Sequence, residues 1–311
     1  MKEVVRRLVN SDPFGIMNRL AYGTKIFLGS PAKWVKELRH DIEADRKSIQ
    51  YNSPHKIVFC AGLPKSGSTM IEHIFENLPY VRANETMMRS FSTGKLDNVH
   101  GVSDWMFKNL PKKKYSFFKL HTHFTEDYFS ILRKYNARVI VSIRDLRDMM
   151  ISRYHHILSQ TDHWQHKDVK GLSDKDGFLK SLVGFSPGEG DIPIVYYYNW
   201  IRDWKEASLI KDIYLCNYEQ YIDKPLEYID GILDWIKFSS FSSTLIEENL
   251  DSIRSAVKML DLNSRIQKKG RKSTTFRKGI AGGYVDFFDE EIKEKFSDLL
   301  PGPENLVLWN K

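Results

Sequence analysis

The chain has 311 residues, of which 41% are hydrophobic and 28% charged, so it can bury a large core and does not belong to the disordered class. Its 47 basic and 40 acidic residues give a formal net charge of +7, which indicates an anionic partner: nucleic acid, a membrane surface or a small phosphorylated ligand. Two cysteines, Cys60 and Cys216, are too few for a disulfide framework or a cysteine-based zinc site, and each closes an apolar run. We therefore expect reduced, buried cysteines and a cytoplasmic protein. No transmembrane segment is expected, because the apolar stretch 14–29 is interrupted by Arg19 and Lys25.

Strand and helix patterns alternate along most of the chain. Ser30-Pro31 has the pattern of a helix start and opens a charged helix to about Ile49, so residues 1–50 are predicted to form an N-terminal helical extension. Nearly apolar runs predict strands at 56–61, 115–120, 137–143 and 212–216. Helical stripes are predicted at 70–78, 146–158, 226–238 and 286–300. This alternation predicts an α/β fold for residues 51–311, a single domain with a central, mostly parallel sheet flanked by helices.

Two polar segments, 84–111 and 161–191, do not follow this rhythm and are expected to be long loops. Such loops are either lids and binding loops or plain surface excursions, and the sequence favours neither. Within the second segment we expect His163 and His166 to lie on a solvated surface. The aromatic run 196–204 either lines a pocket or packs a helix, and its helical core spacing favours packing.

A phosphate-binding loop is predicted between the first strand and the first helix of the domain. The segment Gly62-Leu63-Pro64-Lys65-Ser66-Gly67-Ser68-Thr69 would direct backbone N–H groups and the positive end of a helix at an anion. The two glycines have the spacing of a Walker A motif, but the lysine precedes the second glycine instead of following it.

The loop 64–69 resembles the 5′-phosphosulfate loop of sulfotransferases that use 3′-phosphoadenosine 5′-phosphosulfate (PAPS) and release adenosine 3′,5′-bisphosphate (PAP). Further motifs of that family follow in the same order: Lys119-Leu120-His121, Ile143-Arg144-Asp145 with Ser152, Tyr218-Glu219 and Arg277-Lys278-Gly279. Together the matches run from about residue 56 to residue 288. The sequence departs from the family pattern at Met70, where an aromatic residue is usual, and at Gly282-Gly283-Tyr284, where the family has Gly-Asp-Trp.

The resemblance implies a role for each matching residue. Lys65, Ser66, Gly67, Ser68 and Thr69 would hold the 5′-phosphosulfate. Arg144 and Ser152 would grip the 3′-phosphate, which the closing loop of Arg277, Lys278 and Gly279 would cover, and Tyr218 would lie near the adenine. Lys65 and Lys119 would neutralise charge during transfer, and His121 would be the catalytic base.

A second histidine leaves the assignment of the base open. His121 and His123 are two positions apart and would share one face of a continuing strand, whereas either could reach the acceptor if the strand ends at Leu120. His121 is favoured because it follows Lys119 by two residues, as in the family. A metal pair is the competing interpretation of His-x-His, but no cysteine or carboxylate cluster in the nearby sequence completes a zinc set, so no metal is expected.

The sequence therefore predicts a PAPS-dependent sulfotransferase acting on a small-molecule, lipid or glycan acceptor that it does not identify. A P-loop small-molecule kinase is one alternative, although Ser68 holds the place of the kinase lysine. The other is a non-catalytic nucleic-acid binder that uses the basic segment 265–278; we expect no nucleic-acid partner, because that function leaves Lys65 and His121 unexplained. Removing the seven basic residues of this segment from the 47 leaves 40, which equals the number of acidic residues.

Overall fold

The computed structural model describes residues 57–76, 81–83, 102, 107, 115–161, 163, 165–183, 194–236 and 281–300. The predicted extension 1–50, the basic segment 265–278 and the predicted closing loop 277–279 lie outside these residues. So does the segment 84–111, apart from Val102 and Phe107, which are buried.

Five strands form one sheet in the described part of the chain, in the order β2-β3-β1-β4-β5, and every neighbouring pair is parallel. The strands are β1 (Ile57–Gly62), β2 (Val81–Ala83), β3 (Tyr115–Leu120), β4 (Arg138–Ile143) and β5 (Ile213–Asn217). The predicted α/β fold with a parallel sheet is confirmed, and four of the strands lie within one residue of their predicted bounds. The short edge strand β2 was not predicted.

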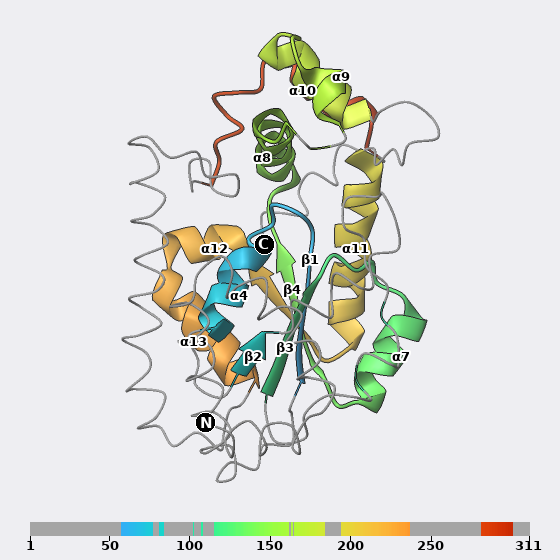
Figure 1. Cartoon of the computed structure of the whole chain (residues 1–311), viewed down its shortest axis with the longest axis vertical. Helices are drawn as coiled ribbons and strands as arrows, with labels where there is room; N and C mark the ends of the chain where they lie inside the picture. Colours follow the sequence, from blue (N-terminus) through green and yellow to red (C-terminus); the bar gives the residue numbers. More distant parts are fainter. Residues whose placement is uncertain are drawn as a thin grey trace, which may run out of the picture.

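Helices cover both faces of the sheet (Figure 1). They are α4 (Ser68–Glu76), α7 (Glu126–Lys134), α8 (Leu146–Ser159), α9 (His166–Val169), α10 (Asp174–Val183), α11 (Ile194–Ile210), α12 (Tyr218–Asp223), α13 (Pro225–Ile236) and α15 (Glu290–Asp298). Alternation along β1 separates the two halves of the core, because successive side chains of a strand point to opposite faces. Phe59 and Ala61 pack in the cluster that contains α7, α8 and α11, whereas Val58 and Cys60 pack in the cluster with α4 and α13.

The buried aromatic and sulfur-containing side chains behave as the sequence predicts. Tyr197, Trp200 and Trp204 on α11 are each 1% exposed, so the aromatic run packs a helix. Cys60 and Cys216 are free and buried. Burial raises the pKa of the Cys60 thiol to about 12, which keeps it protonated and unreactive at neutral pH.

The prediction of a loop over 161–191 is wrong in its central part, where α9 and α10 form. Ser173 begins α10 with a reciprocal contact to Asp176, since its hydroxyl accepts the Asp176 N–H and donates to the Asp176 carboxylate. The helix then buries Phe178 and Leu182, four residues apart. The predicted solvated surface is also wrong for His166, which is 9% exposed with Nδ1 3.0 Å from the Ile157 carbonyl oxygen. The apolar stripe of α10, formed by Phe178 and Leu182, was missed because it is short and follows three charged residues, 174–176.

Candidate active site

The loop after β1 is held in shape by its own backbone and by β4. Ser66 Oγ donates to the Leu63 carbonyl at 2.7 Å, and Ser142 Oγ of β4 donates to the Ser66 carbonyl at 2.8 Å. Lys65 (φ 72°) and Gly67 (φ 96°) both adopt the left-handed region, which reverses the chain between strand and helix. Ser68 begins α4, with Thr69 in its first turn. The N–H groups at the start of α4 therefore form a site suited to an anion.

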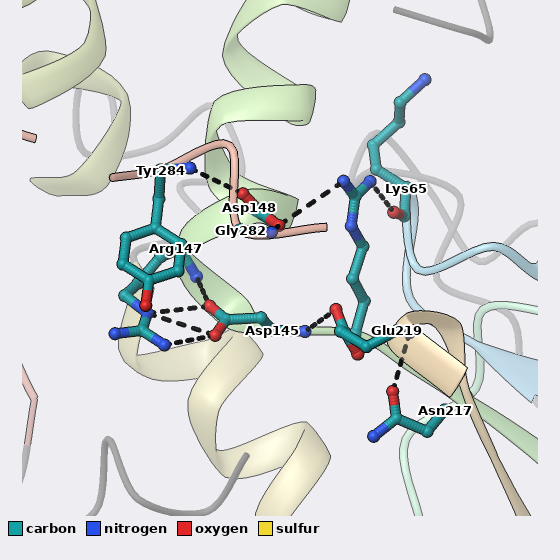
Figure 2. A network of polar contacts seen from close by, with 9 residues as sticks. Lys65, Asp145, Arg147, Asp148, Asn217, Glu219, Gly282 and Tyr284 are labelled. Atoms are coloured by element: carbon teal, nitrogen blue, oxygen red, sulfur yellow. Dashed lines mark hydrogen bonds and ion pairs between the residues drawn. The ribbon is translucent and has the colours of Figure 1, made fainter. Parts of the chain in front are cut away.

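Lys65 contributes both its ammonium group and its backbone to this region. Its carbonyl oxygen accepts a hydrogen bond from Arg144 Nη1 at 3.3 Å, while its side chain extends away from that network (Figure 2). Burial, and then the nearby Arg144 charge, lower the pKa of Lys65 from 10.5 to about 8. An anion bound at the loop would favour the charged form of Lys65.

Arg144 and Tyr218 pack against each other beside the loop that follows β1. The Arg144 guanidinium carbon lies 4.4 Å from the centre of the Tyr218 ring, a cation–π contact. A Cβ at Gly67 would come within 2.6 Å of Tyr218 Cδ2, so the loop backbone and the ring are in close contact. Three residues predicted from separate motifs are thus brought together, and Ser152 is buried two turns into the neighbouring helix α8.

Carboxylates connect these elements (Figure 2). The Asp145 N–H donates to Glu219 Oε1 at 3.0 Å, which joins the start of α8 to α12. Asp148 accepts the backbone N–H groups of Gly282 and Tyr284, at 2.7 and 2.9 Å. Sequence reasoning missed Asp148, although opposite charges four positions apart, here on Arg144 just before α8 and on Asp148 in its first turn, are a signal for an ion pair.

Lys119 and the two histidines lie at or just after the carboxyl end of β3, beside the loop that follows β1. Lys119 Nζ forms an ion pair with the buried Glu72 carboxylate of α4, a partner that sequence reasoning missed. His121 Nδ1 hydrogen-bonds the Gly62 carbonyl oxygen at the end of β1. His123 Nε2 lies 2.6 Å from Asp203 Oδ2 of α11.

The two histidines therefore have different partners. His121 faces the loop that carries Lys65, and His123 faces α11. In a neutral ring whose Nδ1–H donates to a carbonyl, the lone pair lies on Nε2, and this is the tautomer that accepts a proton there. Of the two, His121 is the one oriented by the phosphate loop.

Metal-binding clusters and membrane-spanning helices are both absent from the described residues. No group of three or more His, Cys, Asp or Glu side chains within the described ranges could hold a metal ion. Among the described helices, none is both long and apolar enough to cross a membrane.

A parallel sheet with a phosphate-type loop at the carboxyl end of its central strand defines a P-loop-like α/β protein. A sequence model described as the sulfotransferase domain matches residues 55–302. The chain therefore belongs to the sulfotransferase family.

Individual relatives are more distant. Flavonol 3-sulfotransferase of Flaveria bidentis is 23% identical over 275 residues, covering 81% of this chain and 83% of the relative. Sulfotransferase 6B1 of Pan troglodytes is 23% identical over 257 residues, covering 81% and 78%. Among solved structures, mouse sulfotransferase SULT7A1 complexed with PAP has a TM-score of 0.53 at 15% identity, covering 83% of this chain and 87% of that one. Retinol dehydratase in complex with androsterone and inactive cofactor PAP has a TM-score of 0.51 at 15% identity, covering 85% of each chain. These two structures share the fold.

Proposed function

We propose that the protein transfers a sulfuryl group from PAPS to a hydroxyl or amine of a small-molecule, lipid or glycan acceptor. The observation that carries this proposal is the contact between His121 Nδ1 and the Gly62 carbonyl. It brings a candidate base, 59 residues away in sequence, to the loop that contains Lys65. Family membership and the PAP complexes of two proteins with the same fold support PAPS as the donor.

The described residues suit both ends of the donor. The first turn of α4, with Ser68 and Thr69, would accept the 5′-phosphosulfate, and Lys65 would balance charge on the leaving phosphate. For the 3′-phosphate, Arg144 just before α8 offers a planar guanidinium, and Ser152, two turns into that helix, offers a hydroxyl. Tyr218 would contact the adenine. Residues 277–279, predicted from the sequence to cover the 3′-phosphate, remain part of this proposal.

In the transfer step, the acceptor oxygen or nitrogen forms a bond to sulfur while the bond from sulfur to the 5′-phosphate oxygen breaks. The acceptor proton passes to Nε2 of His121, and PAP leaves. Lys119, which is held beside α4 by Glu72, would attract the sulfuryl oxygens. The chain's own groups thus supply the charge stabilisation and the base that the step requires.

Donor binding is the first test. We expect PAP to raise the melting temperature even in the presence of EDTA, because the proposed donor site binds the phosphates through N–H groups, lysine and arginine and needs no metal ion. Turnover would then be measured with sulfur-labelled PAPS against acceptors that begin with flavonols, after the plant relative. Stabilisation only by magnesium-ATP would instead indicate a kinase, and salt-sensitive binding to DNA or RNA without PAP binding would indicate a nucleic-acid binder.

Matched histidine variants test the base. We expect His121→Ala to reduce kcat by about 100-fold or more, the lower end of the usual contribution of general base catalysis, with little change in PAP affinity. His123→Ala is the control, since its partner is Asp203 of α11. A large loss of kcat in His123→Ala with a mild effect of His121→Ala would show that the base is His123.

A further inference from the structure

Asp148 is a buried carboxylate in the first turn of α8, and each of its two oxygens accepts a backbone N–H. It is 1% exposed; Oδ2 accepts the Gly282 N–H at 2.7 Å and Oδ1 accepts the Tyr284 N–H at 2.9 Å. Arg144 Nη2 lies 4.0 Å from Oδ2. Burial raises the pKa of Asp148, whereas Arg144 and the two N–H groups favour its ionised form. A charge buried this deeply needs partners, and here they come from segments more than 130 residues apart.

A second contact fixes the same C-terminal turn to α8. The Arg147 guanidinium carbon lies 3.6 Å from the centre of the Tyr284 ring, and Arg147 Nε donates to Asp145 Oδ1 at 2.9 Å. The turn 282–284 is therefore held through its backbone by Asp148 and through its aromatic ring by Arg147 (Figure 2). The Tyr284 ring thus offers a surface on which the Arg147 guanidinium stacks.

Arg144 is fixed at the same time by groups from three elements. Its guanidinium contacts the Lys65 carbonyl of the loop after β1, the Tyr218 ring of α12 and the Asp148 carboxylate of α8. Of these three groups, Asp148 alone also holds the turn 282–284. Its charge thus links the orientation of Arg144 to the position of the C-terminal segment.

We propose that Asp148 is a positioning residue of the donor site, which aligns Arg144 and the turn 282–284 so that the 3′-phosphate meets a guanidinium already in place. This inference rests on the proposed function, where Arg144 is assigned to the 3′-phosphate.

The test compares PAP with adenosine 5′-monophosphate, which lacks only the 3′-phosphate. In Asp148→Asn one N–H donor loses its acceptor and Arg144 loses a neighbouring charge. The quantity to compare is the dissociation constant of the monophosphate divided by that of PAP. We expect this ratio to shrink by about fivefold or more in Asp148→Asn, because PAP binds more weakly while the affinity for the monophosphate is nearly unchanged. A purely structural defect would weaken the binding of both nucleotides alike. Asp289→Asn is the matched control, because Asp289 also accepts a backbone N–H in the C-terminal segment, from Ile292 at 2.9 Å, and should leave the ratio unchanged.

A double-mutant cycle adds a second readout. If Asp148 acts through Arg144, Asp148→Asn should have little further effect on the ratio in an Arg144→Lys background. An undiminished ratio in Asp148→Asn, or full additivity with Arg144→Lys, would overturn the inference and leave the proposed function intact. A wild-type protein that binds both nucleotides equally would overturn the proposed donor site itself.

Hydrogen exchange keeps the inference testable if Asp148→Asn does not fold. In the wild-type protein, PAP should slow exchange at the amides of Gly282 and Tyr284 more than saturating adenosine 5′-monophosphate does, because only PAP would bind next to Arg144. Equal protection by the two nucleotides would contradict the inference.

Discussion

Lys65 has a lowered pKa in the loop where the 5′-phosphosulfate is proposed to bind. Burial and Arg144 lower its pKa to about 8, and an anionic ligand favours the ammonium form. Below that pH, Lys65 is already charged and PAP binds at full strength. Above it, binding must take up a proton, so we expect the affinity to fall by up to about tenfold per pH unit as the pH rises through about 8 to about 9.5.

Lys65→Arg separates this effect from other titrations, since a guanidinium keeps its charge throughout this range. We expect the pH dependence of PAP binding, measured by calorimetry, to flatten in this variant. The same lowered pKa has the opposite consequence for folding. Because the unfolded chain binds the proton more tightly, the contribution of Lys65 to stability rises between about pH 8 and the unperturbed value of 10.5. A PAP affinity that is constant across this range in the wild type would contradict the prediction.

Gly67 is required for two separable reasons. Its φ of 96° strains any residue with a Cβ, and that Cβ would lie 2.6 Å from Tyr218 Cδ2. We expect Gly67→Ala to lower the free energy of unfolding by about 1–2 kcal/mol through the backbone and by a further 1–3 kcal/mol, roughly, through the clash. It should also weaken PAP binding, because Tyr218 and Arg144 would shift together.

Gly171 provides the control for the backbone part. Its φ is 84°, and a Cβ there would meet nothing within 4 Å. In urea unfolding, Gly171→Ala should therefore show only the backbone loss of about 1–2 kcal/mol in unfolding free energy, and its PAP affinity should be normal. Equal losses of stability in the two variants would show that the contact with Tyr218 is not what makes Gly67 necessary.

At the scale of elements, α11 holds the chain segment that carries the candidate bases. Trp200 and Trp204 both donate their indole N–H groups to the Thr122 carbonyl, at 2.9 and 3.0 Å. Thr122 lies between His121 and His123, so this double contact fixes the chain just beyond β3. One carbonyl oxygen has two lone pairs and can accept both bonds.

The shared acceptor predicts a non-additive mutant pair. In Trp200→Phe or Trp204→Phe alone the Thr122 carbonyl keeps the other indole as a donor, whereas the double variant removes both indole donors. We expect the double variant to lose more unfolding free energy than the sum of the two singles, by about 1 kcal/mol or more. Urea denaturation measures all three. Simple additivity would mean that the indoles act through packing alone.

The sheet was predictable because each of its central strands is a short apolar run covered on both faces, a pattern that a sequence displays directly. The helix α10 was not predicted, since its large buried apolar side chains are only Phe178 and Leu182, and Phe178 packs against Phe287 and Phe288, more than 100 residues away, as well as against Tyr154 of α8. Its capping residues Ser173 and Asp176 were a usable local signal. Elements whose stability comes from distant partners are the ones that a local pattern predicts least well.

The candidate site likewise contains residues that the sequence could predict and residues that it could not. Lys65 and Gly67 stand in a loop whose pattern follows from phosphate chemistry, and Arg144 stands in a motif that resembles one of the family, so the sequence was enough to propose all three. Glu72 and Asp148 could not be proposed in this way, because their importance lies in contacts with Lys119 and with the Gly282 N–H, and such pairings are set by packing between elements. Motifs identify groups that touch a ligand, whereas the groups that hold them appear only in three dimensions.

At the scale of the whole molecule, the net charge of +7 arises from one segment. The seven basic residues of 265–278 account for the excess, and the rest of the chain is neutral. Two of the seven, Arg277 and Lys278, are predicted to contact the donor. The other five are Arg265, Lys268, Lys269, Arg271 and Lys272. Charges outside a binding site attract an anionic ligand over about 10 Å at ordinary salt and so act mainly on the rate of association.

Replacing these five residues by glutamine would lower the net charge from +7 to +2. We expect association with PAP, followed by stopped-flow, to slow a few-fold at low ionic strength, with unchanged dissociation and a difference that disappears as salt is added. Neutralising five exposed basic residues elsewhere gives the same net charge and should slow association less: Arg133, Lys134, Lys167, Lys170 and Lys224. Faster dissociation in the first variant would place some of these side chains in direct contact with the donor. Equal slowing in both variants would mean that total charge, and not its location, governs the encounter.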